Sequence, residues 1–187
     1  MPTISIIIPT IGRQTLCNVL QSLVGQVIEG DEIMVVQDGI ENRAFVDTVV
    51  RSYDLPITHC ICGPTHSYGN AQRNFGISIA QGDYLSFMDD DDVYTPDALS
   101  IIRENVGSVP ILFRMQYHDG RYLWTDPILR MGNVGTPMIV VPNVQDKIGQ
   151  FTGMYEGDWY FIDETVKLWD GAVDWCEDVI ARIRPHA

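Results

Sequence analysis

Short, almost wholly apolar runs alternate with helical patterns through the first half of the chain. The predicted strands are residues 4–8, 32–36, 56–62 and 84–88. The predicted helices between them are residues 16–27, 45–53 and 69–80. Strands without polar alternation are typical of a parallel sheet that is covered on both faces. This alternation predicts an α/β fold with an open, mostly parallel central sheet flanked by helices.

The second half of the chain has a mixed pattern. Asp119-Gly120 separates two strand-like runs and predicts a hairpin. Thr95, Pro96 and Asp97 predict an N-cap, a first helical proline and an acidic first turn for a helix that reaches residue 106. The further predicted elements are a strand at 138–141, a helix at 159–169, and two short closing strands at 172–175 and 179–184. No linker divides the halves, so we expect one domain over residues 1–187.

Charge and hydropathy exclude several classes of protein. The 187 residues include 25 acidic and 12 basic ones, a formal net charge of -13. Such a chain repels polyanions, so we expect no nucleic-acid partner. It lacks an apolar run of about 18 residues and the pattern of a secretion signal, so we expect no transmembrane segment and a cytoplasmic location. Composition leaves the oligomeric state open.

Four potential metal ligands lie close together in the sequence, namely His59, Cys60, Cys62 and His66. A zinc site usually spaces its paired cysteines by two to four residues, whereas one residue separates this pair. The alternative is a strand that buries both thiols as small apolar groups. We favour the strand, and four cysteines in a cytosolic chain indicate reduced thiols.

Four consecutive aspartates, Asp89 to Asp92, follow an apolar strand directly. In an extended segment the side chains of Asp89 and Asp91 point the same way, and that of Asp90 points the opposite way. Hard carboxylate oxygens favour Mg²⁺ or Mn²⁺, so this pair predicts a divalent-cation site. The alternative is an acidic loop that merely precedes a helix.

Polar residues also stand at the ends of other predicted strands. Thr10 follows the first strand, Asp38 the second and Asp89 the fourth. Ligands of open α/β sheets bind at the carboxyl ends of the strands. We therefore expect these three residues to line one binding site.

Four segments together resemble the family 2 glycosyltransferases of the GT-A fold. They are SIIIPT (5–10), VVQDG (35–39), GNAQRNFGI (69–77) and GDYLSFMDDDD (82–92). The resemblance implies a single GT-A domain that binds a nucleotide-diphosphate sugar, with a UDP-sugar favoured. About residues 1–92 would bind this donor, and about residues 93–187 would form the acceptor side.

The resemblance also implies roles for single residues at the donor site. Pro9, Thr10 and Asp38 would contact the base and ribose, and Arg73 would lie near the base or the diphosphate. Asp89 and Asp90 would belong to the donor site as well. Two of these residues have simpler interpretations, because Asp38 suits an Asp-Gly turn and Arg73 suits a solvated helix position.

Within the same acidic run, Asp89 and Asp91 would form the DxD motif, with Asp91 the more direct ligand of Mn²⁺ or Mg²⁺. Gln37 replaces the acidic residue that is common before Asp38, which leaves the base preference open.

A further acidic segment, EGDWYF (156–161), is similar to the catalytic segment of the family. The alignment makes Asp158 the catalytic base, although Gly157 interrupts the usual acidic pair. The alternative is that Asp158 caps the helix that begins at Trp159. Near the C-terminus, RIRPH (182–186) resembles an ending in which the histidine, here His186, completes the metal site.

These roles imply an inverting, metal-dependent transfer to an acceptor hydroxyl, with Asp158 as base. The acceptor, whether a glycan, a lipid-linked molecule or a small molecule, cannot be identified from the sequence. A non-catalytic module that binds a nucleotide sugar or glycan is an alternative. A sugar nucleotidyltransferase fits less well, because residues 9–13 offer one glycine and no lysine for a triphosphate.

Overall fold

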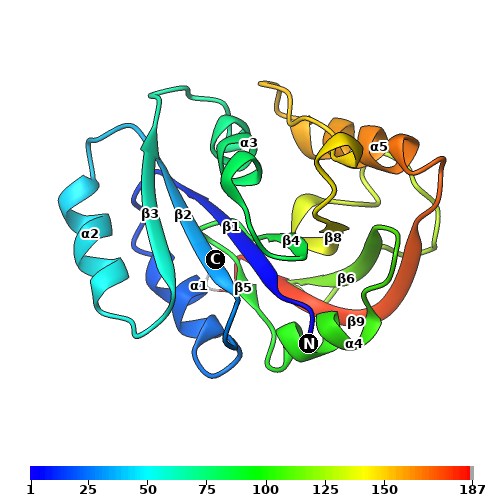
Figure 1. Cartoon of the computed structure of the whole chain (residues 1–187), viewed down its shortest axis with the longest axis horizontal. Helices are drawn as coiled ribbons and strands as arrows, with labels where there is room; N and C mark the ends of the chain where they lie inside the picture. The colour runs from blue at the N-terminus through cyan, green and yellow to red at the C-terminus, as the bar shows by residue number, and fades with distance from the viewer. Residues whose placement is uncertain (186–187) are drawn as a thin grey trace.

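The computed structural model describes residues 1–185, and within them nine strands form one sheet. The strands are β1 (Ile4–Thr10), β2 (Glu32–Asp38), β3 (Ile57–Cys62), β4 (Tyr84–Phe87), β5 (Val93–Tyr94), β6 (Ile111–Tyr117), β7 (Tyr122–Leu123), β8 (Ile139–Pro142) and β9 (Asp174–Ile183). Their order is β3-β2-β1-β4-β8-β6-β9-β5, with β7 beside β6. The sheet continues through both halves of the chain, which therefore form a single α/β domain (Figure 1).

The first four strands are parallel, as the sequence predicts. β1 lies between β2 and β4 and pairs in parallel with both, and β3 extends this arrangement beyond β2. All seven residues of β1 are buried, which explains its lack of polar alternation. β8 then joins β4 in the antiparallel sense, and β6 continues from β8, so the sheet is mixed in its second half.

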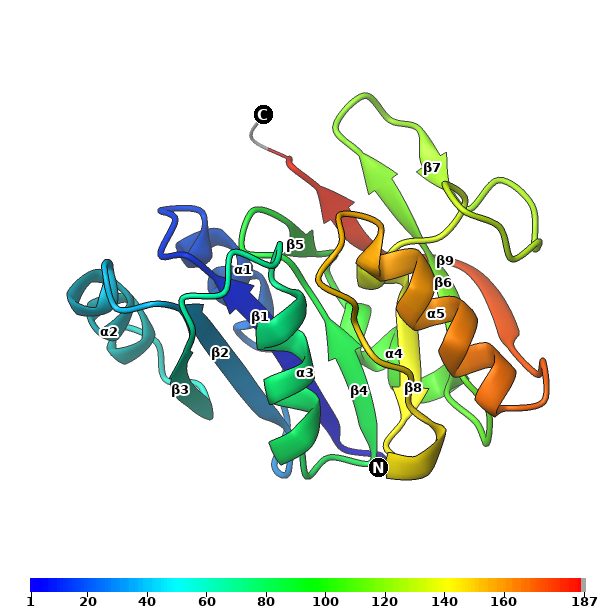
Figure 2. The same ribbon diagram turned by 90° about the horizontal axis from the view of Figure 1, so that it is seen from above.

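Helices cover both faces of the sheet. They are α1 (Leu16–Leu23), α2 (Arg43–Arg51), α3 (Asn70–Ile79), α4 (Ala98–Asn105) and α5 (Gly157–Leu168), with short 3₁₀ turns at η1 (Thr136–Met138) and η2 (Gln145–Lys147). α3 and α5 lie on the same side of the sheet, and α1 and α4 lie on the other (Figures 1 and 2). α3 packs closely on β1, because a Cβ atom on Gly76 would meet the Ile7 side chain at 2.6 Å.

Two predicted elements of the second half are corrected by the structure. α4 begins at Ala98 and not at Pro96, because the Thr95 hydroxyl donates to the Val179 carbonyl at 2.7 Å and does not cap the helix. The two predicted closing strands are one strand, β9, whose pairing with β6 contains register irregularities. Residues 176–178, which separate the two predicted strands, lie on this irregular stretch. The predicted hairpin between β6 and β7 is confirmed.

Of the four potential zinc ligands, His59, Cys60 and Cys62 lie on β3, whereas His66 lies in the loop that follows the strand. Cys60 and Cys62 lie partly buried on β3 and pack against the core. His59 contacts the Asp47 carboxylate at 2.8 Å and the Gln37 amide at 3.1 Å. Among the described residues, the group suited to a metal ion lies elsewhere.

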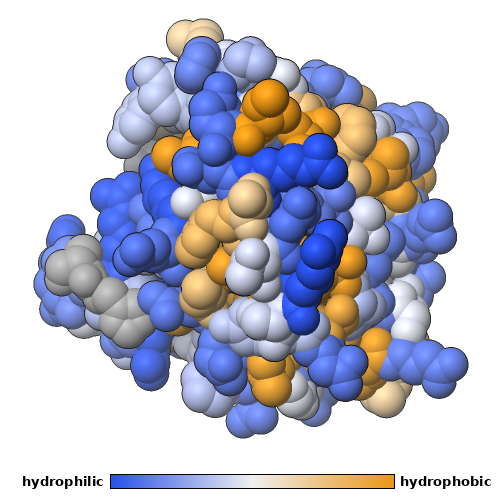
Figure 3. Space-filling model, turned by 90° about the vertical axis from the view of Figure 1, so that its left-hand side faces the viewer, coloured by the Kyte–Doolittle hydropathy of each residue, from blue (hydrophilic) through white to orange (hydrophobic). Residues whose placement is uncertain are grey.

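The surface is mostly polar on one face of the molecule. On the face seen from the left-hand side of Figure 1, polar residues predominate and apolar ones are interspersed among them (Figure 3). Of the helices in the part of the chain that the structure describes, none is long and apolar enough to cross a membrane.

Candidate active site

A cavity of about 790 Å³ opens at the carboxyl ends of the parallel strands. Thr10, Asp38 and Asp89 line it together, as their positions at the strand ends predict. Asp158 and Gly135 line it from the second half of the chain. Its volume lies within the range of cavities that hold small ligands.

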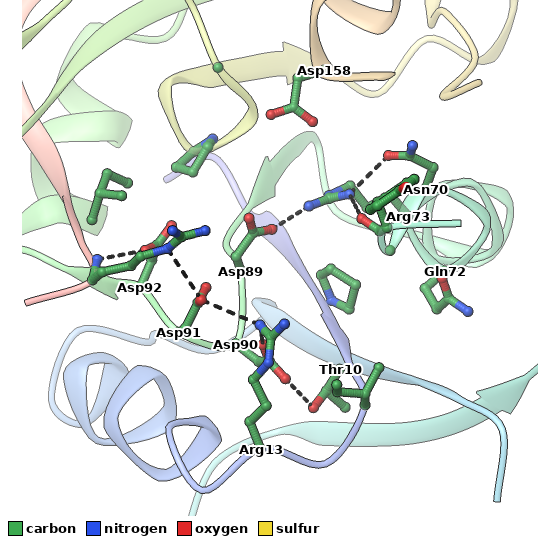
Figure 4. A pocket seen from close by; sticks show the side chains of 18 of the residues that line it. Thr10, Arg13, Asn70, Gln72, Arg73, Asp89, Asp90, Asp91, Asp92 and Asp158 are labelled. Atoms are coloured by element: carbon green, nitrogen blue, oxygen red, sulfur yellow. Dashed lines mark hydrogen bonds and ion pairs between the residues drawn. The ribbon is translucent and has the colours of Figure 1, made fainter. Parts of the chain in front are cut away.

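The four aspartates divide into two groups around this cavity. Oxygen atoms of Asp89, Asp91 and Asp92 lie within 4.8 Å of one another, whereas Asp90 is directed toward Thr10 and Arg13 (Figure 4). The extended segment expected here is not observed: the run forms a turn in which the Asp92 backbone N–H donates to the Asp89 carbonyl at 3.2 Å, and this turn brings Asp92 to Asp89 and Asp91. Three carboxylates at this spacing fit a hard divalent cation such as Mg²⁺ or Mn²⁺.

Asp90 lies beneath this group and fixes the loop. Its carboxylate accepts a hydrogen bond from the Thr10 hydroxyl at 2.6 Å and pairs with Arg13 at 2.8 Å. Burial raises the pKa of Asp90, and the Thr10 hydrogen bond and the Arg13 charge counteract this shift. The hydroxyl of Thr10 thus helps to hold the acidic loop in place.

Asp92 belongs to the same acidic group, although it was not predicted as a metal ligand. Asp92 is 3% exposed, and its carboxylate accepts a hydrogen bond from the backbone N–H of Arg184 at 2.8 Å. Burial, reinforced by the charge of Asp89, raises the pKa of Asp92 to about 8. The run of four aspartates contained this residue, but alternation alone placed it with Asp90.

Arginine side chains balance the acidic group. Arg13 and Arg184 both approach the same oxygen of Asp91, each at 3.4 Å, and Arg73 pairs with Asp89 (Figure 4). Arg13 belongs to the loop after β1, and Arg184 follows β9. Neither arginine was predicted as a site residue, because neither stands directly at the end of a parallel strand.

Arg73 is 3% exposed, so the solvated position considered for it is wrong. Its guanidinium lies between the carboxylates of Asp89 and Asp158 (Figure 4). Burial acts to lower the pKa of Arg73, but the charges of Asp89 and Asp158 outweigh this and raise it. Arg73 therefore stays charged and links the two acidic parts of the cavity.

Asp38 at the end of β2 and Pro9 near the end of β1 also line the cavity. The Asp38 carboxylate accepts hydrogen bonds from the backbone of Thr65 at 2.7 Å and of His66 at 3.0 Å. It therefore anchors the loop after β3 as well as lining the cavity. Pro9 lines the same region.

Asp158 lies in the first turn of α5 and faces Asp89 and Arg73 across the cavity (Figure 4). The helix starts two residues earlier than the capping hypothesis requires, with Glu156 at the N-cap position and no side-chain cap. The hypothesis that Asp158 caps the helix is therefore wrong. One of its oxygens accepts a 3.3 Å hydrogen bond from the Thr136 backbone. His186, the other predicted site residue, lies outside the described residues.

Comparison with known proteins identifies relatives of this chain. The family described as "Glycosyl transferase family 2" matches residues 5–157. An uncharacterized glycosyltransferase of Haemophilus influenzae is 33% identical over 107 residues, which cover 54% of this chain and 35% of that protein. A putative colanic acid biosynthesis glycosyl transferase, WcaA of Escherichia coli, is 34% identical over 101 residues, 54% of this chain and 36% of that protein. The matched regions thus span about a third of each relative.

Solved structures share the fold. S. aureus TarS superposes with a TM-score of 0.73 at 19% identity, over 98% of this chain and 36% of that one. TarS 1-349 in complex with UDP-GlcNAc gives a TM-score of 0.70 at 18% identity, over 97% of this chain and 58% of that one.

Proposed function

Because the chain belongs to glycosyl transferase family 2, we propose that it transfers a sugar from a UDP-sugar to an acceptor hydroxyl with inversion of the anomeric centre. One observation carries the proposal. The acidic group of Asp89, Asp91 and Asp92 and the carboxylate of Asp158 line the same cavity. This arrangement provides separate places for a donor diphosphate and for a proton acceptor.

The donor occupies the side formed by the parallel strands. Pro9, Thr10 and Asp38 line the base and ribose end, while Arg73 and the acidic loop, Asp90 included, border the diphosphate end. TarS has been solved with UDP and with UDP-GlcNAc, which supports a UDP-sugar as donor.

The acidic loop suits a divalent cation. Asp91 and Asp89 would hold Mn²⁺ or Mg²⁺, with Asp92 and His186 as further ligands. When bound, the cation stabilises the negative charge that develops on the leaving diphosphate. The carboxylates that would hold the cation would then repel the diphosphate less strongly.

The transfer itself requires one base. Asp158 accepts the proton of the acceptor hydroxyl while the acceptor oxygen forms a bond to the anomeric carbon. The bond between that carbon and the diphosphate oxygen breaks, and its electron pair leaves with UDP. The attack comes from the face opposite to the leaving group, so no covalent enzyme intermediate forms. The acceptor is a glycan, a lipid-linked molecule or a small molecule.

A two-stage experiment tests this function. Nucleotide sugars are first screened by thermal shift with and without Mn²⁺, because a ligand at 100 times its Kd adds about 2.7 kcal/mol of stability. Release of UDP from each stabilising donor is then measured for the wild type and for Asp158→Asn. Turnover that depends on Asp158 supports an enzyme. Binding without turnover supports a non-catalytic module and contradicts the proposal.

A further inference from the structure

The segment that leads to Asp158 is fastened to α3. Asn74 exchanges two hydrogen bonds with the backbone of Phe151, at 2.8 and 2.9 Å. One turn earlier on the helix, the Asn70 amide nitrogen donates to the carbonyls of Thr152 at 2.7 Å and Met154 at 2.8 Å. Residues 151–154 run between α3 and α5 (Figure 2). Helix α3, in the first half of the chain, therefore holds in place the segment that leads to Asp158.

Asn70 also reaches the acidic loop. Its side-chain oxygen accepts a hydrogen bond from Arg73 at 3.1 Å, and Arg73 in turn pairs with Asp89. Asn70 is 2% exposed. An amide supplies both donors and the acceptor that this position uses, whereas a carboxylate offers no donor and an alanine offers neither. Asn70 thus connects the carbonyls before α5 with the guanidinium beside Asp89.

The first residue of α5 packs directly against Asn70. A Cβ atom added at Gly157 would lie 2.4 Å from the Asn70 amide nitrogen, 2.8 Å from Cγ and 2.9 Å from the oxygen. All three atoms lie beyond the Cβ of Asn70. Glycine is therefore required here for space, and it allows the turn that carries Asp158 to approach α3. This contact explains why a glycine interrupts the acidic pair of the segment EGDWYF.

We propose that Asn70 is a positioning residue that sets the place of Asp158 relative to Asp89 through its hydrogen bonds and its contact with Gly157. The inference rests on the proposed function, because it takes Asp158 to be the base. Displacement of a reacting group by about 1 Å can cost on the order of 100-fold in rate. Asn70 acts on catalysis through Asp158 and does not itself contact the reacting atoms.

A double-mutant cycle tests the proposal. The four chains are the wild type, Asn70→Ala, Gly157→Ala and the double variant, and the readout is UDP release from UDP-GlcNAc with Mn²⁺. We expect each single change to lower kcat at least about tenfold. UDP affinity of Gly157→Ala, measured by calorimetry, should stay within about threefold of wild type, because this change leaves the hydrogen bond between Asn70 and Arg73 its two partners. Gly157→Ala tests the contact without removing any hydrogen-bonding group.

The effects of the two substitutions on kcat should not be additive. Alanine at position 70 removes the three atoms that a Cβ at position 157 would meet, so Gly157→Ala should lower kcat by less than about twofold in the Asn70→Ala background. Asn74→Ala is the matched control. It loosens the same segment, but it leaves Asn70 in place, so Gly157→Ala should keep its full tenfold effect in that background.

The outcomes separate this inference from the proposed function. A wild-type kcat for Asn70→Ala, in a protein that Asp158→Asn inactivates, overturns the positioning role alone. Additive effects of Asn70→Ala and Gly157→Ala overturn it as well. A wild-type kcat for Asp158→Asn overturns the base assignment and the inference with it.

Discussion

The carboxylate of Asp92 accepts a 2.8 Å hydrogen bond from the backbone N–H of Arg184, 92 residues further along the chain. The contact joins the acidic loop after β4 to the end of β9. It also helps to enclose a carboxylate that has no side-chain counter-ion among the described residues within ion-pair distance. One carboxylate of the acidic group is thus held by a segment far away in the sequence.

Stability should depend on the protonation of Asp92. The pKa of Asp92 is raised to about 8 in the folded chain, above its ordinary value of 3.8, so the folded state holds a proton that the unfolded state has lost. The free energy of unfolding contributed by this group therefore falls as the pH rises from about 4 to about 8. We expect Asp92→Asn to remove that fall and to raise stability at pH 8, by on the order of a few kcal/mol.

Urea denaturation at pH 5 and pH 8, with a chelator present, measures this effect. The exposed variant Asp146→Asn is the control and should keep the wild-type pH dependence. An Asp92→Asn variant with an unchanged slope between the two pH values would contradict the assignment.

Binding of UDP should require a divalent cation held by Asp91. Asp91→Asn keeps the size of the side chain but removes a negative ligand, so we expect the affinity for UDP in the presence of Mn²⁺ to fall at least about tenfold. Calorimetric titration measures it, and Asp146→Asn serves again as the matched control. Equal UDP affinity of the wild type in Mn²⁺ and in excess chelator would show that the acidic group holds no cation needed for the donor.

Arg13 should compete with the cation for Asp91. The guanidinium of Arg13 lies 3.4 Å from an oxygen of Asp91, and its side chain is 49% exposed, so solvent weakens the pair. We expect Arg13→Gln to strengthen Mn²⁺ binding, by up to about fivefold. Direct titration with Mn²⁺ checks this, with Arg130→Gln, which disrupts an exposed pair with Asp126, as the control. Weaker Mn²⁺ binding in Arg13→Gln would show that the arginine organises the ligands.

Turnover should depend on Asp158 and not on the other acidic residues of α5. Asp158→Asn should lower kcat at least about 100-fold, because an amide cannot accept the proton of the acceptor hydroxyl. Asp163→Asn lies on the same helix and breaks a surface pair with Lys167, so its kcat should stay within about twofold of wild type. UDP release assays compare the two, and equal losses would indicate damage to the helix.

Most of the first half of the fold was predictable from local pattern. The apolar runs before Thr10, Asp38 and Asp89 are buried strands, and the parallel order of these strands follows from the helices between them. The start of α4 and the continuity of β9 were not predictable, because the Thr95 hydroxyl bonds to Val179 and the pairing of β9 depends on β6. Those contacts join segments that hydrophobic periodicity treats separately.

The sequence by itself determined which polar residues stand at the carboxyl ends of the parallel strands. Because these ends meet at one edge of the sheet, it also determined that Thr10, Asp38 and Asp89 line one cavity. Only the tertiary structure decided that Arg13 and Arg184 meet at Asp91, and that Asn70 faces Gly157. The physical reason is that strand and helix patterns arise from neighbours along the chain. Contacts across a cavity depend instead on how the finished sheet and helices pack, which no local repeat records.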